Sequence, residues 1–215
     1  MGSSESRGGL MIKRRFIFIV SLAAAVLMAQ GCGSGDGGPG TGADTGSAPG
    51  ETGSVAASFS LTSASIDSGG AISKKYACES EGGSDISPQL GWTGPPAGVA
   101  AYAVIMDDET PPCGKGASAC MHWSVFNIPA DKTGLAEGED MSAIGGVALG
   151  RNYTGANGYA GPCPPSPHVY KITVYALSGD APVIKAGEAY TRAGFEAAFA
   201  RSIIGSDTIE GTYSP

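Results

Sequence analysis

Alternating apolar and polar positions predict four β-strands in the middle of the chain. The segments are rich in β-branched and aromatic residues, which favour strands, and they span residues 58–66, 100–106, 122–128 and 169–177. In the last segment, Lys171 and Thr173 share one face. The opposite face holds Tyr170, Ile172, Val174 and Ala176. This period of two is typical of a strand with one face in the core.

One helix is expected, at residues 191–204. Its apolar positions approximate a helical stripe made by Ala193, Phe195, Ala198, Phe199 and Ile203. Gly205 follows as a natural stop. Connections rich in Gly and Pro separate these elements, and strands and helices do not alternate regularly. The pattern favours a mainly β domain of antiparallel sheets with one or two peripheral helices.

The first residues have the pattern of an export signal. A basic cluster, Lys13, Arg14 and Arg15, precedes an apolar run at residues 16–29 that is short for a membrane span. The run ends in "LMAQGC", where Cys32 follows Gly31 as in the lipobox of bacterial lipoproteins. Residues 1–31 are therefore expected to be a lipoprotein signal peptide, translated from Met11, with Cys32 carrying lipid. The competing interpretation is an ordinary secretory signal.

A segment rich in glycine follows Cys32. Residues 33–57 contain no Lys or Arg and few large apolar side chains, so the segment cannot offset the entropy of ordering its backbone. Residues 32–57 are expected to form a flexible tether, and residues 58–215 a single folded domain. The net charge of −7, without a long stretch dense in Lys and Arg, argues against a nucleic-acid partner.

Four cysteines remain for the domain, an even number that suits an oxidising compartment. Cys113 and Cys120 flank a short loop and form the simplest pair, which leaves Cys78 with Cys163. Zinc binding is the competing interpretation, although the chain lacks the CxxC spacing typical of zinc sites.

Polar residues cluster where the expected strands meet loops. Asp107, Asp108 and Glu109 follow one strand and precede Thr110, Pro111 and Pro112. Such a run is also typical of an ordinary turn. His122 and His168, the only histidines, each begin a strand, and His168 follows a segment stiffened by prolines. A lone histidine there is usually structural, but two at strand starts can converge on one site.

Several motifs occur in a fixed order: "SPQLGW", "PPAG", "DDETPP", "HWSVFNIP", "GYAGPCPPSPHVY" and "VYAL". In this combination the chain resembles the phosphatidylethanolamine-binding protein family, specifically its bacterial Raf-kinase-inhibitor-like branch. The resemblance is clear over residues 58–177. It implies a β-sandwich of antiparallel sheets with a Greek-key element and a shallow pocket for anions.

The resemblance also implies which residues bind the ligand: Asp107, Glu109, Pro111, His122, Gly161, Pro162, His168 and Tyr170. Two positions depart from the family's pattern. Glu109 replaces an aspartate, and Val169 stands where an arginine is common, which removes a positive charge. Anion donors are expected from His122, Tyr170 and backbone amides, with His168 and the acids tuning protonation.

The expected function is noncatalytic binding of a phosphate-bearing, phospholipid headgroup-like ligand at the bacterial cell envelope. No cofactor is expected. Gly33 is not the aspartate that commonly retains lipoproteins in the inner membrane, so the outer membrane is weakly preferred. The main alternative is a secreted inhibitor that acts on a protease, and less readily on a kinase. A hydrolase, or a metal site using Asp107, Asp108, His122 and His168, lacks a sequence signature.

Overall fold

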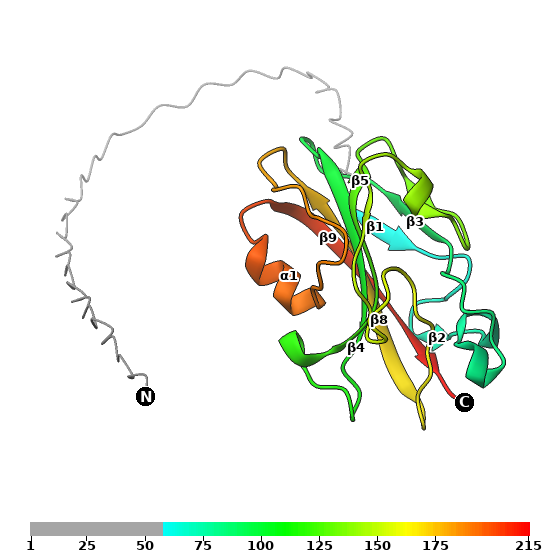
Figure 1. Cartoon of the computed structure of the whole chain (residues 1–215). Helices are drawn as coiled ribbons and strands as arrows, with labels where there is room; N and C mark the ends of the chain where they lie inside the picture. Colours follow the sequence, from blue (N-terminus) through cyan, green and yellow to red (C-terminus); the bar gives the residue numbers. More distant parts are fainter. Residues whose placement is uncertain (1–57) are drawn as a thin grey trace, which may run out of the picture. The chain divides into compact units, whose positions relative to one another are not determined.

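A computed structural model describes residues 58–215, which form a mainly β domain (Figure 1). Met11, Cys32 and the expected signal peptide and tether lie outside the described residues. The mainly β class agrees with the expectation from the sequence. No helix within residues 58–215 combines the length and the apolar character needed to cross a bilayer.

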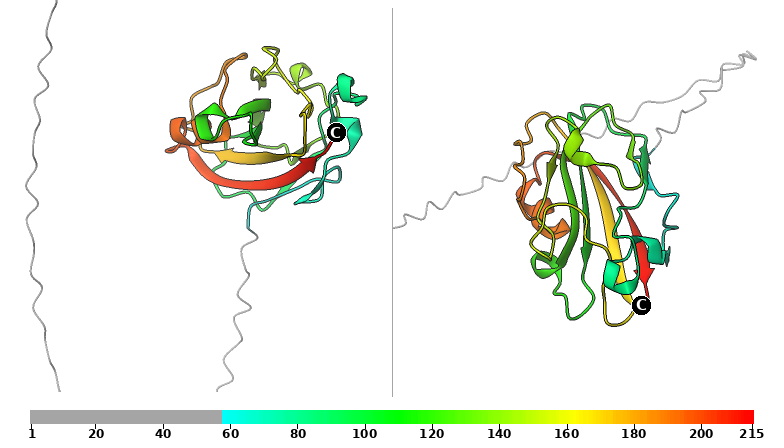
Figure 2. Two further views of the ribbon diagram at one scale, coloured as in Figure 1. Left: turned by 90° about the horizontal axis from the view of Figure 1, so that it is seen from below. Right: turned by 45° about the vertical axis from the view of Figure 1, so that its right-hand side comes forward.

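The larger of two sheets has six strands in the order β2–β9–β8–β4–β5–β7. Its members are β2 (Gly70–Ala71), β4 (Ala101–Asp108), β5 (Cys120–Pro129), β7 (Ala148–Leu149), β8 (His168–Leu177) and β9 (Ile203–Tyr213). All neighbours in this sheet are antiparallel except β2 and β9. Figure 2 shows β8 and β9 curving side by side along their length.

The smaller sheet packs on one face of the larger one. It consists of β1 (Ser60–Thr62), β3 (Leu90–Thr93) and β6 (Gly134–Leu135), in the order β1–β3–β6. Trp92 of β3 packs against Tyr102 of β4, with ring centroids 5.1 Å apart. The main core between the sheets also holds Leu61, Leu90, Val104, Met106, Ile172 and Val174. This sandwich is held together mainly by burial of these side chains.

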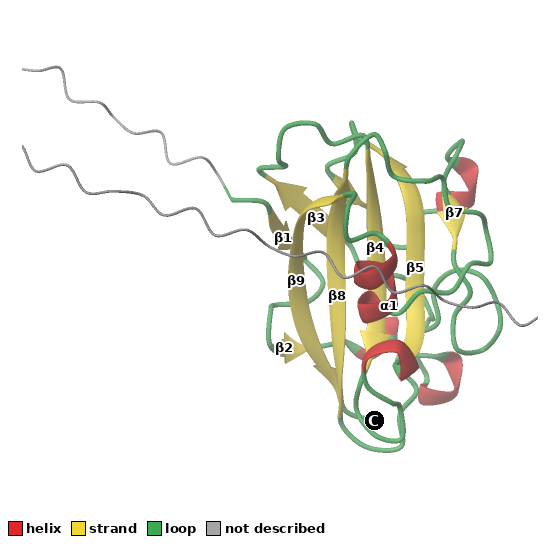
Figure 3. Cartoon of the chain, turned by 90° about the vertical axis from the view of Figure 1, so that its left-hand side faces the viewer, coloured by secondary structure: helices red, strands yellow, loops and turns green. Residues whose placement is uncertain are grey.

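The opposite face of the large sheet is covered by helix α1 (Arg192–Ala198) (Figure 3). The Thr191 hydroxyl caps the helix by accepting a hydrogen bond from the Gly194 backbone N–H. Phe195 packs on Tyr175 of β8 and stacks on Phe126 of β5. The central strands are therefore buried on both faces, which explains their nearly continuous apolar sequence.

Two expectations about the C-terminal region are wrong in detail. The helix is shorter than residues 191–204, because it ends at the cap residue Phe199. Ile203 and Gly205 belong to the eleven-residue strand β9, which pairs along the whole of β8. The first expected strand, residues 58–66, is ordered as a strand only over β1.

Short 3-10 helices and two disulfides complete the domain. The 3-10 helices are η1 (Lys74–Tyr76), η2 (Glu79–Glu81), η3 (Gly116–Ser118) and η4 (Met141–Ala143). Cys113 is bonded to Cys120, and Cys78 to Cys163, as the cysteine spacing predicts.

Candidate functional site

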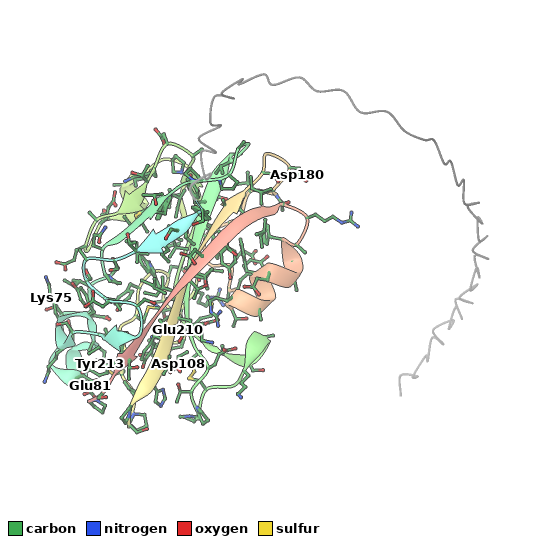
Figure 4. All side chains as sticks on the ribbon, turned by 180° about the vertical axis from the view of Figure 1, so that it is seen from behind. Lys75, Glu81, Asp108, Asp180, Glu210 and Tyr213 are labelled. Atoms are coloured by element: carbon green, nitrogen blue, oxygen red, sulfur yellow. A yellow bond between two sulfur atoms is a disulfide. The ribbon has the colours of Figure 1, made fainter. Side chains whose placement is uncertain are left out.

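Three strands bring the candidate residues to one end of the large sheet. Asp108 is the last residue of β4, and it pairs with Cys120, the first residue of β5. On its other side Asp108 pairs with Tyr170, two residues after His168 begins β8. Figure 4 places Asp108 and Tyr213, the last residue of β9, at this end. Antiparallel pairing thus gathers strand ends that are distant in sequence.

A cavity of about 120 Å³ opens at this end of the sheet. It is lined by Asp108, Pro112, Cys113, Cys120, His122, Tyr153, Cys163, Pro164, Pro165, His168 and Tyr170. Both histidines line it, so the prediction that they converge on one site agrees with the geometry. Three lining residues, Cys113, Cys120 and Cys163, belong to the two disulfides. The disulfides therefore fix these parts of the cavity lining covalently to the domain.

Asp108 and His168 form a buried pair in the cavity wall. The Asp108 Oδ2 atom lies 2.6 Å from His168 Nδ1, and the two residues are 1% and 2% exposed. The other carboxylate oxygen of Asp108 accepts the Thr110 backbone N–H at 2.7 Å. His168 Nε2 is buried and has no hydrogen-bond partner within residues 58–215. A buried polar atom without a partner is costly unless a ligand or water occupies the space beside it.

His122 stands beside this pair on β5. Its Nδ1 donates to the Ala160 carbonyl at 2.8 Å, and the residue is 4% exposed. The Tyr170 ring meets it edge-on, and the Tyr153 ring lies on it at a tilt, with centroids 5.0 and 4.7 Å away. Burial lowers the pKa of His122, because the charged ring loses hydration.

The acidic residues separate into two groups. Asp108 faces the cavity, but Asp107 does not line it: its carboxylate accepts the Arg192 backbone N–H at 2.9 Å and also bonds the guanidinium. Glu109 accepts the Gly116 backbone N–H at 2.8 Å and contacts Lys171. The sequence analysis places Asp107 and Glu109 at the pocket, but in the structure Asp108 is the acidic residue that lines it. Adjacent residues on a strand face opposite sides, so a shift of one position exchanges the faces.

Burial and hydrogen bonds shift the pKa values of Asp107 and Glu109. Burial raises the pKa of Asp107, although its bonds to Arg192 act in the opposite direction. The bond from Gly116 lowers the pKa of Glu109. Asp107 thus anchors the start of α1 to β4, a structural contact that the sequence did not indicate.

The expected proline-rich wall, Gly161, Pro162, Pro164 and Pro165, reaches the cavity only in part. Pro164 and Pro165 line it together with Cys163, whereas Gly161 and Pro162 are not among the lining residues. The Pro162 carbonyl accepts the Cys78 backbone N–H at 3.0 Å, next to the Cys78–Cys163 disulfide. Prolines fix φ, so this wall keeps its shape without a ligand. Similarly, Pro112 lines the cavity and Pro111 does not.

Tyr153, which lines the cavity from a loop, was missed in the sequence. Thr110, part of the expected acidic turn, supports the rim: its hydroxyl accepts a hydrogen bond from the Val169 backbone N–H, at 3.0 Å. Loop residues carry no periodicity, so no pattern could place Tyr153. The motif "SPQLGW" contributes elsewhere: Leu90 and Trp92 are in the core, and Ser87 lines a separate cavity.

The histidines and acids do not form a metal centre in this arrangement. Within residues 58–215, no three His, Cys, Asp or Glu side chains are grouped as ligands for one ion. Asp107 is engaged with Arg192, which separates it from Asp108 and the two histidines. The lining cysteines are in disulfides, so they offer no thiolate.

Comparison with known proteins gives a consistent result. A family model described as phosphatidylethanolamine-binding protein matches residues 62–214. The UPF0098 protein of Aquifex aeolicus is 38% identical over 120 residues, covering 54% of this chain and 66% of that protein. UPF0098 protein YbcL of Escherichia coli is 36% identical over 133 residues, covering 57% of this chain and 70% of that protein.

Two solved structures are similar over the folded region. The crystal structure of Escherichia coli YbcL, described as a new member of the mammalian PEBP family, superposes with a TM-score of 0.64 at 28% identity. It covers 74% of this chain and 99% of YbcL. The putative PEBP homologue CT736 of Chlamydia trachomatis gives a TM-score of 0.60 at 31% identity, covering 74% of this chain and 98% of CT736.

Proposed function

Because the chain belongs to the phosphatidylethanolamine-binding protein family, we propose that it is a noncatalytic binding protein of the bacterial cell envelope. Its ligand is a small anion, either phosphate or the phosphate group of a headgroup, held in the cavity where β4, β5 and β8 meet. One observation carries the proposal: the buried Nε2 of His168 has no partner in the described chain, and it belongs to a residue that lines this cavity.

The dimensions and chemistry of the cavity suit this ligand class. About 120 Å³ fits a phosphate or carboxylate group rather than an acyl chain. Tyr170 and Tyr153 add hydroxyl groups, and burial raises the pKa of both, so they stay protonated and can donate hydrogen bonds. The proline wall and the disulfides reduce the reorganisation needed on binding.

The lining residues favour binding over catalysis. The pair of Asp108 and His168 resembles the orienting half of a hydrolase triad, which also needs a nucleophile within reach of the imidazole. Neither serine nor threonine is among the residues that line the described cavity. Ser166, between two prolines, is exposed, and the cavity's cysteines are oxidised.

Attachment to the envelope is the second part of the proposal. It rests on the basic cluster, the apolar run and Cys32 in "LMAQGC". Lipid on Cys32 would hold the domain near a membrane through the expected tether, whose root-mean-square reach is about 25 to 30 Å for a flexible coil of this length. A phospholipid headgroup and free periplasmic phosphate are then both accessible ligands.

Calorimetric titration tests the binding function. The full chain with intact disulfides is titrated with inorganic phosphate and with phosphorylethanolamine, beside the variants His122→Ala and Arg201→Ala. Arg201 is exposed and does not line the cavity, so it is a matched control. We expect saturable binding that is lost in His122→Ala and kept in Arg201→Ala.

Inhibition assays test the competing role of a secreted inhibitor. If neither ligand binds and the chain inhibits a serine protease or carboxypeptidase at micromolar concentration, the anion proposal is wrong and the inhibitor alternative replaces it.

A further inference from the structure

The cavity contains a negative charge and no fixed positive charge. Asp108 is its only carboxylate, and neither lysine nor arginine is among its described lining residues. Lys171, on β8, pairs with Glu109 and Glu210, and Arg192 bonds Asp107. An anion beside a buried carboxylate is strongly disfavoured unless a positive charge or a proton enters with it.

The hydrogen bond to Asp108 fixes the tautomer of His168. An ionised carboxylate can only accept, so His168 Nδ1 carries a hydrogen and donates to Oδ2 at 2.6 Å. In the neutral ring, Nε2 therefore presents a lone pair. This atom is the buried one without a partner in the described chain. As a lone pair it repels a bare anion and accepts a hydrogen bond from a protonated oxyacid.

His122 has the same arrangement of donor and acceptor nitrogens as His168. The Ala160 carbonyl can only accept, so His122 Nδ1 also carries a hydrogen, and the Nε2 of the neutral ring is an acceptor. Burial lowers the pKa of His122 and so favours this neutral form. Both histidines that line the cavity are thus held through Nδ1, which leaves Nε2 as the acceptor atom of each neutral ring.

We infer that the site takes its anion together with one proton, and so selects hydrogen phosphate and phosphate monoesters over sulfate. This inference rests on the proposed function and specifies its ligand class. The monoanion of a phosphate monoester, whose second pKa is about 6, brings the proton as P–OH, which donates to His168 Nε2; about a tenth of the monoester is in this form at pH 7. Sulfate has no proton to bring at neutral pH. A phosphodiester also has none, so for both ligands the proton on Nε2 must come from the buffered solvent, which weakens their binding as the pH rises.

Only the shared proton moves in this event: it lies between the ligand oxygen and His168 Nε2, and no other bond forms or breaks. With that proton in the site, a phosphate dianion, the proton and Asp108 sum to two negative charges, and a singly charged phosphodiester leaves one. Without it, a dianion beside Asp108 would leave three negative charges in the cavity. The cost of burying uncompensated charge therefore favours the proton-carrying form.

The groups around His168 leave it as the proton acceptor. Asp108 faces it from β4, His122 from β5, Tyr170 from its own strand, and Tyr213 pairs with it on β9. Burial raises the pKa of both tyrosines, so they remain neutral over the pH range of the test. None of these groups supplies a permanent positive charge.

Calorimetric titration of the full chain with three probes tests the inference: inorganic phosphate, sulfate and glycerophosphorylethanolamine, the last being a diester headgroup. Each is titrated at pH 7.0 and 8.0 in two buffers of different ionisation enthalpy, which gives the number of protons taken up. We expect phosphate to bind at least tenfold more tightly than sulfate. The diester should take up close to one proton and weaken about tenfold per pH unit, as one linked proton requires. Comparing the affinities for phosphate and for the diester also shows whether the site prefers free phosphate or a phospholipid headgroup.

Two variants distinguish this role from a structural one. Asp108→Asn offers His168 an amide hydrogen, which allows the tautomer with hydrogen on Nε2 and removes the buried negative charge. We expect it to bind sulfate within threefold of phosphate and without proton uptake. His168→Gln, which supplies an amide donor directly, should give the same result if Asp108→Asn does not fold. Arg201→Ala should keep the preference of the unmodified chain for phosphate over sulfate.

The outcomes separate this inference from the proposed function. Sulfate binding as tight as phosphate binding, or diester binding without proton uptake, overturns the inference and leaves anion binding intact. If Asp108→Asn and His168→Gln still prefer phosphate over sulfate, the inference is also overturned. Failure of all three probes to bind overturns the proposed function and the inference with it.

Discussion

At the residue scale, the two neighbouring aspartates of β4 have different tasks. Asp107 joins β4 to Arg192 at the start of α1, and Asp108 orients His168 in the cavity. The sequence places acids, histidines and prolines in the right region, but a resemblance of motifs leaves the register of a short acidic run open by one residue. Strand pairing fixes that register, because one step along a strand moves the side chain to the opposite face.

Asp107→Asn should therefore destabilise the domain without weakening ligand binding. The change leaves the Arg192 guanidinium without its buried counter-charge, and loss of one partner of such a pair costs about 3 kcal/mol. Urea denaturation measures the loss, and calorimetry with phosphate measures the affinity. Asp108→Ala is the matched change at the next position, and it should change phosphate affinity and reduce the preference for phosphate over sulfate, because it removes the group that orients His168. Equal effects of both variants on affinity would contradict the division of tasks.

His122 should make the domain less stable in acid. Burial lowers its folded pKa below the unfolded value of about 6.5. Between these two values the unfolded chain binds a proton that the folded chain does not, so stability falls as pH decreases below about 6.5. The slope is at most about 1.4 kcal/mol per pH unit for one proton.

Urea denaturation at pH 7.5, 6.5 and 5.5 measures this dependence. His122→Gln, whose amide can still donate to Ala160, should show a smaller loss of stability over the same range. His168 is present in both proteins, so the difference between the two profiles isolates His122. Parallel profiles would show that His122 does not contribute.

At the element scale, the fold follows from the sequence where one periodicity dominates. β4, β5 and β8 have long apolar runs that alternate or are buried on both faces, and all three were predicted within two residues. β9 has Gly205, Ser206 and Asp207 in its interior, so its identity as a strand depends on pairing with β8 rather than on its own pattern. The predicted helix was too long because Ile203 matches a helical stripe as well as a strand.

The proline wall depends on a close contact between two chain segments. A Cβ atom on Gly161 would overlap the Tyr76 carbonyl oxygen and lie 2.8 Å from the Cys78 backbone nitrogen. Neither backbone atom can rotate away, so the wall would have to move. We expect Gly161→Ala to destabilise the domain by about 2 to 3 kcal/mol, in the range of overpacked sites, and to weaken phosphate binding.

Gly145→Ala is the matched control, because nothing lies within 4 Å of a Cβ atom at that position. Its effect on unfolding should stay within about 0.5 kcal/mol, as for ordinary surface changes. Thermal unfolding and phosphate titration of both variants give the comparison. If Gly161→Ala behaves like the unmodified chain in both measurements, this contact does not hold the wall in place.

At the scale of the whole molecule, residues 58–215 combine a rigid sandwich with a site at one end of its central strands. Both faces of those strands are covered, one by the small sheet and one by α1, so the site's strand ends have little freedom to shift. In our proposal, ligand binding changes the position of a proton at His168 Nε2 and leaves the shape of the cavity unchanged. A rigid cavity that gains affinity through a proton would respond to ligand chemistry and to pH.

The proposed anchoring is testable on the full chain expressed in a bacterial host. Cells producing the unmodified chain, Cys32→Ala or Gly33→Ala are separated into membrane and soluble fractions, and the mass of the purified protein is measured. Cleavage before Cys32 with lipid attached should place the unmodified chain and Gly33→Ala in the membrane, with a mass increase from acyl groups. Cys32→Ala should lack that increase, because the acceptor sulfur is gone. An ordinary secretory signal predicts instead that all three proteins are soluble and free of lipid, so equal fractionation of Cys32→Ala and the unmodified chain would replace the anchored binding protein by a secreted one.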